Sequence, residues 1–176
     1  MATHILDETP AAFAPALKAT LRELLAQAPA ELLTGVRKII LLTSVTDPKV
    51  LRASGNVSSQ YLYKDGAAII HIYLANIDRK RWRLIPLSWR PWSRARLLTG
   101  ALSYPLAHQK CRGNPENREL LRNDARKIQA LLLRRWVASW VEKYPAGDRL
   151  RDLFRRYMEA RIRRFWPGGP HQPQNV

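Results

Sequence analysis

Residues 79–96 contain the densest group of side chains that could bind a ligand. The segment is RKRWRLIPLSWRPWSRAR, in which seven basic residues alternate with three tryptophans and no acidic residue occurs. Guanidinium groups pair with phosphates, and indole faces stack on unpaired bases. Each stack contributes about 1–3 kcal/mol to the free energy of binding. We therefore expect a nucleic-acid surface made of Arg79, Lys80, Arg81, Trp82, Arg83, Trp89, Arg90, Trp92, Arg94 and Arg96. In the alternative interpretation, the tryptophans fill a core beneath a solvated basic surface.

A second basic surface is predicted on a helix over residues 148–166. Its apolar side chains recur at helical spacing and form a stripe: Leu150, Leu153, Phe154, Tyr157, Met158, Ile162, Phe165 and Trp166. The opposite face is almost wholly arginine, and only Asp148, Asp152 and Glu159 offset it. Solvated helices usually mix both signs of charge, so this face favours a polyanion, bound by Arg151, Arg155, Arg156, Arg163 and Arg164. An acidic membrane surface is the alternative, because the stripe ends in two aromatic residues.

The net charge of the chain lies entirely in its second half. The 176 residues include 30 Lys or Arg and 14 Asp or Glu, for a net charge of +16. Residues 1–78 hold seven basic and seven acidic side chains, whereas residues 79–166 hold 23 basic and seven acidic ones. All six tryptophans also lie in residues 79–166. Such a field attracts phosphate-bearing partners over a Debye length of about 8 Å, so a polyanion is the expected partner.

The residues that usually form metal sites or nucleophilic sites are few and dispersed. No two of the four histidines share a helical turn. His108 and Cys111 lie three residues apart, but two ligands make an incomplete metal site. The sequence also contains no glycine-rich phosphate loop and no Gly-x-Ser-x-Gly motif. We therefore predict a non-catalytic protein without a metal or another cofactor.

The compartment is predicted from cysteine and apolar content. Cys111 is the only cysteine, so an internal disulfide is impossible and a reducing compartment is expected. No stretch reaches the roughly 20 apolar residues of a membrane span. The first residues lack the basic run and apolar stretch of a signal peptide. A cytoplasmic location is the prediction.

Hydrophobic periodicity predicts an α+β fold in residues 1–166, followed by a disordered tail over residues 167–176. A first helix is expected over residues 10–28, and a buried strand over residues 36–45. A β-hairpin follows, because Asp65 and Gly66 join two β-rich runs at residues 57–63 and 67–74. The first half is thus a helix and a small three-stranded sheet.

The second half is predicted to be helical after an ordered basic loop over residues 79–96. Pro86 and Pro91 exclude a regular helix in that loop. A helix over residues 97–109 is weakened by Gly100 and Pro105. The next helix is clear, because Asn114 can cap a run that continues to about Lys143 with one apolar side: Leu121, Ala125, Ile128, Leu132, Trp136 and Ser139.

Two segments resemble small zincin-type metalloprotease domains. YLYKDGAAIIHIYL corresponds to the strand pair before the active-site helix, and RLLTGALSYPLAHQK corresponds to that helix. Zincins carry H-E-x-x-H there, which places two zinc ligands and a general base on one face. In this chain Ser103, Tyr104 and Ala107 occupy those three positions, and His108 follows. If the motif is aligned one residue later, Tyr104, Pro105 and His108 occupy its three positions, and only His108 matches.

The resemblance covers about residues 36 to 130. Asp124 stands near the place of the third, acidic zinc ligand. What the resemblance implies is a zincin-type scaffold that has lost its metal and its peptidase activity, a pseudoenzyme that has gained a basic surface.

Taken together, these patterns predict a non-catalytic protein that binds RNA or single-stranded DNA with low sequence specificity. Arginines would neutralise phosphates, and the tryptophans of residues 79–96 would stack on bases. The protein could act alone or as a subunit of a larger nucleoprotein assembly. Three alternatives remain open: a zincin relative, a basic protein that binds an acidic protein, and one that binds a membrane surface.

Overall fold

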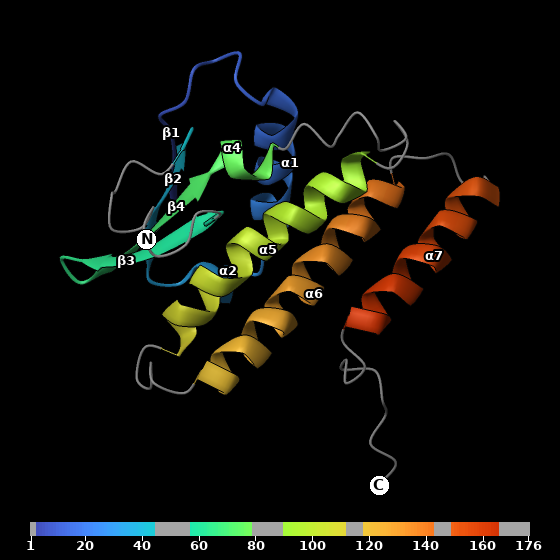
Figure 1. The fold of residues 1–176 in the computed structure, drawn as a ribbon. Helices are drawn as coiled ribbons and strands as arrows, with labels where there is room; N and C mark the ends of the chain where they lie inside the picture. Colours follow the sequence, from blue (N-terminus) through green and yellow to red (C-terminus); the bar gives the residue numbers. More distant parts are fainter. Residues whose placement is uncertain (1–2, 45–56, 79–89, 112–117, 143–148, 166–176) are drawn as a thin grey trace, which may run out of the picture.

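A sheet and a set of long helices form the α+β architecture of the computed structural model (Figure 1). The structure describes residues 3–44, 57–78, 90–111, 118–142 and 149–165. The strands are β1 (His4–Asp7), β2 (Val36–Leu42), β3 (Ser59–Lys64) and β4 (Ala67–Tyr73). The helices are α1 (Pro15–Ala26), α2 (Ala30–Leu33), α4 (Leu74–Ile77), α5 (Arg90–Lys110), α6 (Arg118–Glu142) and α7 (Arg149–Phe165).

The sheet has the strand order β1-β2-β4-β3. β1, β2 and β4 are parallel, and β3 pairs antiparallel with β4. The predicted hairpin is confirmed: Asp65 and Gly66 adopt φ angles of 52° and 78°, which a two-residue hairpin turn requires. Apolar residues alternate along β2 and β4, so Ile39, Ile70 and Ile72 are fully buried under the helices.

β1 makes the sheet four-stranded, whereas three strands were expected. Its four residues are all exposed and offer no hydrophobic pattern to recognise. Tertiary contacts hold it instead. Lys18 of α1, almost fully buried, places its Nζ 3.1 Å from Asp7 Oδ2 and donates to the Pro10 carbonyl at 3.0 Å. A hydrogen bond from the Thr9 hydroxyl, together with Lys18, lowers the pKa of Asp7, so its carboxylate stays charged and ties β1 to α1.

α5 is the central helix of the molecule and packs against β3, β4, α1 and α6. Leu98, Leu102 and Leu106 are essentially fully buried on it. The helix begins at Arg90, so the prediction of a loop up to residue 96 is wrong for residues 90–96. Pro91 is compatible with this start, because the first helical turn needs no backbone N–H donor. The predicted weakening by Gly100 and Pro105 does not interrupt the helix.

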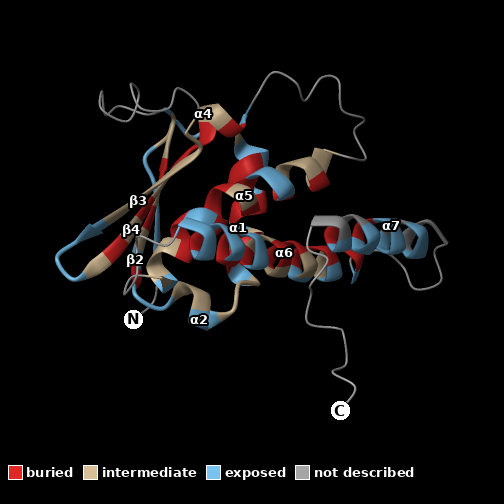
Figure 2. Ribbon diagram, turned by 60° about the horizontal axis from the view of Figure 1, so that its bottom comes forward, coloured by how far each residue is buried: buried red, intermediate tan, exposed pale blue. Residues whose placement is uncertain are grey.

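α6 and α7 extend the helical layer away from the sheet (Figure 1). On α6 the predicted apolar side is confirmed from Leu121 to Trp136, and Ser139 is half-buried. α7 packs on α6 and not on the sheet, and Figure 2 shows little buried surface on it. Met158 and Ile162 are buried, but Leu153 is 66% exposed and Tyr157 38%. The predicted apolar stripe of this helix is therefore only partly buried.

Gly35 connects α2 to β2 at a place where no other residue fits well. Its φ is +80°, and a Cβ built there would overlap the side-chain amide of Gln109. That amide joins two elements: Gln109 Oε1 accepts a hydrogen bond from the Tyr61 hydroxyl at 2.8 Å, and Nε2 donates to the Thr34 carbonyl at 3.4 Å. The close approach of Gly35 allows α5 to be fixed to both β3 and the α2–β2 turn.

Replacing Gly35 with Ala should lower the free energy of unfolding by about 1–2 kcal/mol, because the left-handed conformation penalises a Cβ. The control is Gly100→Ala in the interior of α5, where the nearest atom to the new Cβ is 3.4 Å away. That change should stabilise by up to about 1 kcal/mol. Chemical denaturation of both variants measures the two changes in the free energy of unfolding, which should have opposite signs. Equal changes would contradict the assigned backbone conformations.

Candidate nucleic-acid interface

The structure describes only part of each of the two predicted basic surfaces. Arg79, Lys80, Arg81, Trp82, Arg83 and Trp89 lie outside the described residues, as do the side chains of Arg151 and Arg164. Arg90, Trp92, Arg94 and Arg96 occupy the first two turns of α5. Arg155, Arg156 and Arg163 are exposed on α7. These seven side chains form two separate groups, one at the start of α5 and one along α7.

Trp92 belongs to the core and not to a binding surface. Only 5% of it is exposed, and it packs in the same apolar cluster as Leu98 and Ile70. Its indole face cannot stack on a base without unfolding, so its prediction as a base-stacking residue is corrected. The cause is the start of α5, since Trp92 and Ala95 fall on the buried side of the helix.

Arg94 is also directed partly into the protein. Its Nε atom is buried and has no hydrogen-bond partner among the described residues. Burial, and next the charge of Arg90, lower the pKa of Arg94. Arg96, in contrast, is exposed. Of the four candidates on α5, Arg96 is therefore the one best placed to meet a large anionic ligand.

Two further tryptophans are structural. Trp136 is 1% exposed and donates from Nε1 to Glu23 Oε2 at 3.2 Å, which links α6 to α1. Trp140 stacks on it with a centroid distance of 5.8 Å and an interplanar angle of 18°. In the described part of the chain, indole rings thus stabilise the helical layer.

Three arginines at four-residue spacing form a ridge on α6 that was not among the predicted site residues. Val141, Val137, Leu133 and Ala130 of α6 are buried, and they border cavities that Ile162 of α7 also lines. Toward the start of α6, Arg126, Arg122 and Arg118 are all exposed at four-residue spacing, and each is turned about 40° further around the helix than the one before. The change from apolar to cationic residues lies near the end of α7, because Ile162 and Arg126 border the same small cavity. The four-residue spacing of these arginines was the signal available in the sequence.

The arginine ridge (Arg118, Arg122 and Arg126) is not neutralised by the carboxylates that the structure describes. No ion pair joins any of the three to an acidic side chain within the described ranges. The neighbouring lysines differ, because the buried Asp124 lies 3.4 Å from Lys110 Nζ and 3.9 Å from Lys127 Nζ. Asp124 therefore pairs with these two lysines and with none of the three arginines, and the ridge remains a cationic surface.

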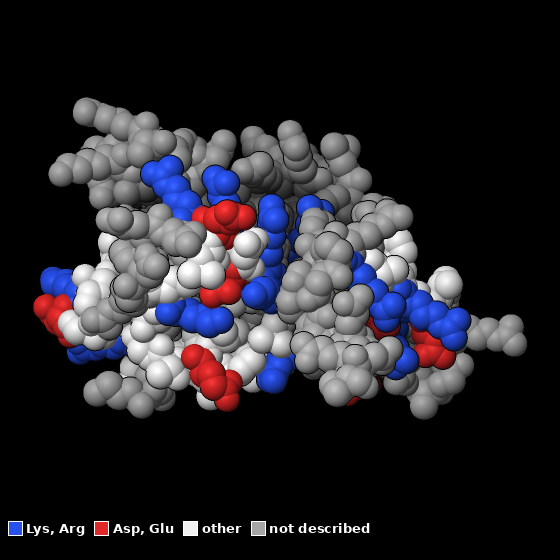
Figure 3. Space-filling model, turned by 90° about the horizontal axis from the view of Figure 1, so that it is seen from below, with Lys and Arg blue, Asp and Glu red and all other residues white. Residues whose placement is uncertain are grey.

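The α6–α7 contact is flanked by further arginines. One side is a cleft of about 380 Å³ bordered by Arg134, Arg155 and Arg163, with Glu142 and Glu159 among them. Arg155 pairs with Glu159 at 3.7 Å, one helical turn along α7. Seen from below, basic and acidic side chains lie next to each other where α7 is found (Figure 3). This flank is thus partly neutralised, in contrast to the arginine ridge.

The three long helices together hold seventeen basic and five acidic side chains, a net of +12. They pack side by side, α5 against α6 and α6 against α7. Most of the +16 of the chain is therefore confined to one helical layer, and the sheet and α1 contribute little to it.

The positions that correspond to the zincin motif have other roles here. The buried Ser103 donates to the Gly100 carbonyl at 3.0 Å, and Ala107 has no ligating atom. His108 stacks on Tyr61 at 5.6 Å, and burial lowers its pKa. Cys111 donates to Asp124 at 3.6 Å, and burial, then this hydrogen bond, raise its pKa. Among the described residues, no three His, Cys, Asp or Glu side chains are grouped so as to hold a metal ion.

Comparisons with protein-family models, with curated proteins and with solved structures found no match to this chain.

Trp92→Ala should destabilise the protein by about 3–5 kcal/mol, because it leaves a cavity beneath α5. Its effect on nucleic-acid binding, corrected for the folded fraction, should be negligible. Thermal denaturation and binding titrations on the same sample separate the two roles. Unchanged stability with weakened binding would restore Trp92 as a base-stacking residue.

Proposed function

We propose that this protein binds nucleic acid through contacts between its helical layer and the phosphate backbone. The arginine ridge is the observation that carries the proposal. It presents three exposed guanidinium groups in a row, without carboxylate partners among the described residues. Guanidinium is the side-chain group best suited to hold phosphate, because it is always charged and donates two parallel hydrogen bonds.

The spacing of the ridge suits a regular polyanion. Residues four apart on a helix lie about 6 Å apart along its axis, so the ridge extends over about 12 Å. One strand of a duplex carries a phosphate about every 3.4 Å along its axis, and the ridge can therefore lie along several consecutive phosphates. Arg96 of α5 adds to the same side, because it borders the cavity that contains Arg126.

Backbone contacts of this kind carry little sequence information, so low sequence specificity is expected. The expected preference for single strands depends on tryptophan stacking. Trp92 lies in the core, and Trp82 and Trp89 lie outside the described residues. We therefore propose that the protein binds RNA or DNA without a preference for single or double strands. In this proposal the protein is a non-catalytic binding subunit, alone or within a nucleoprotein assembly.

An acidic membrane surface is the second candidate, and one observation favours it. Leu153 and Tyr157 are exposed on α7, on a helix that also presents Arg156. Such a helix can lie in the interface of an anionic bilayer. None of the described helices is long and apolar enough to cross a membrane.

Replacing Arg118, Arg122 and Arg126 together with Gln should weaken nucleic-acid binding similarly for all sequences. It should also reduce the slope of log affinity against log salt by about 2 for the single strand and about 3 for the duplex, because each lost phosphate contact removes about 0.7 or 0.9. Fluorescence anisotropy with a labelled duplex and a labelled single strand, at several salt concentrations, measures both quantities. Folding should be retained, since all three side chains are exposed.

The matched control replaces Arg22, Arg37 and Lys64 with Gln. It removes the same charge from the neutral half of the chain and should change the salt slope by less than half as much. Equal slopes for the two triple variants would show that net charge, not the ridge, determines binding. Anionic vesicles that compete fully with the labelled duplex, in a manner abolished by Leu153→Gln, would favour the membrane candidate.

A further inference from the structure

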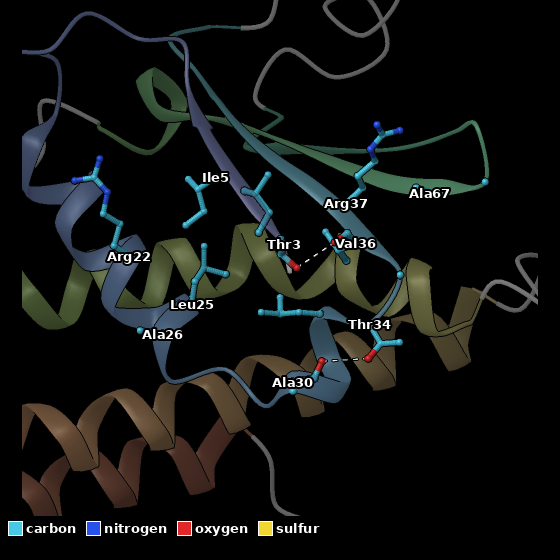
Figure 4. Close-up of a pocket in the computed structure, with 14 residues that line it drawn as sticks. Thr3, Ile5, Arg22, Leu25, Ala26, Ala30, Thr34, Val36, Arg37 and Ala67 are labelled. Carbon is cyan, nitrogen blue, oxygen red and sulfur yellow. Dashed lines mark hydrogen bonds between the residues drawn. The ribbon is translucent and has the colours of Figure 1, made fainter. Parts of the chain in front are cut away.

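A second candidate site lies in the neutral half of the chain, apart from the arginine ridge. It is a cavity of about 680 Å³ between α1, α2 and the β1–β2 side of the sheet (Figure 4). Small-molecule sites usually measure about 300–1,000 Å³ and are mostly apolar. The other cavities described above are smaller, at about 380 and 140 Å³.

The floor of this cavity is apolar because it belongs to the core. Leu25 of α1 and Val36 and Ile39 of β2 line it, and they are 8%, 3% and 0% exposed. Ile5 of the edge strand lines it as well but is 38% exposed. The opening remains because α2 has only four residues and cannot cover the helix-facing side of β1. A ligand with an apolar body would bury Ile5 there.

The polar groups of the cavity select the charge of the ligand. The hydroxyl groups of Thr3 and Thr34 already donate to the carbonyls of Val36 and Ala30, at 3.0 and 3.2 Å. The described lining includes no Asp or Glu and two arginines. Figure 4 shows Arg22 and Arg37 on opposite sides of the apolar lining, with both guanidinium groups directed away from it. A charged head group would thus be bound at the rim, in contact with water.

The two arginines are not equivalent. Arg22 lies 4.0 Å from Asp7, so an anion beside it would also face a carboxylate. Arg37 is exposed, and no acidic side chain of the described residues pairs with it. Electrostatic complementarity therefore favours the Arg37 side of the rim for a negative group.

We propose that this cavity binds a single-chain amphipathic anion, with its apolar body against Ile5 and Leu33 and its carboxylate or similar head group at Arg37. The proposal does not depend on nucleic-acid binding, because the cavity and the arginine ridge share no residue. The apolar body supplies most of the affinity, because its binding removes apolar surface from water. Arg37 supplies the preference for an anion.

Isothermal titration of the full chain with decanoate, decanol and decyltrimethylammonium tests the proposal. Decanoate should bind saturably with one molecule per chain, and more tightly than the other two compounds. Ala30→Trp should abolish binding, since Ala30 is exposed on α2 and the indole would fill the cavity without replacing a core side chain. Thermal denaturation confirms that this variant is folded.

Charge variants test the position of the head group. Arg37→Gln should weaken decanoate binding about two- to five-fold, as expected for an exposed ion pair, and should leave decanol binding unchanged. Arg22→Gln and the distant control Arg156→Gln should each have less than half that effect. Equal affinity for the three compounds, binding that persists in folded Ala30→Trp, or equal losses in all three arginine variants would overturn the proposal.

Discussion

Apolar packing around α5 has to overcome the mutual repulsion of its neighbours' charges. Three adjacent helices carry a net of +12, and such self-repulsion destabilises a compact state. Leu98, Leu102 and Leu106 of α5 are buried where the sheet, α1 and α6 meet. Two specific contacts reinforce this packing: Asp124 balances Lys110 and Lys127, and Trp136 is anchored to Glu23. Arg118, Arg122 and Arg126 therefore stay exposed on this packed layer.

The sequence predicted the elements with a strong local signal. Asp65 and Gly66 determined the hairpin through their turn conformation, and the periodicity of α6 identified its buried side. β1 could not be predicted, because a four-residue edge strand is held by Asp7 and Lys18 and not by its own pattern. The early start of α5 was missed for a different reason. Pro91 was interpreted as a helix breaker, although proline is favoured in the first turn of a helix.

The exposure of arginines on α7 could be predicted from the sequence, but the ridge on α6 could not. Arginine was correctly expected to be exposed on α7 at Arg155, Arg156 and Arg163. The sequence alone did not show that the described tryptophans are buried or half-buried while arginines are exposed. The outcome for each residue depends on which face of α5 and α6 meets the core. The arginine ridge required tertiary information as well: its residues are exposed because α7 ends beside Arg126.

The central claim is that the arginine ridge contacts the phosphates of a nucleic acid. Modification of arginines with phenylglyoxal, with and without bound duplex, followed by mass spectrometry of the peptides, measures this residue by residue. Arg118, Arg122 and Arg126 should be protected by the duplex, while the exposed Arg22 and Arg37 should react at the same rate in both samples. Equal protection of all five arginines, or protection confined to Arg22 and Arg37, would contradict the account.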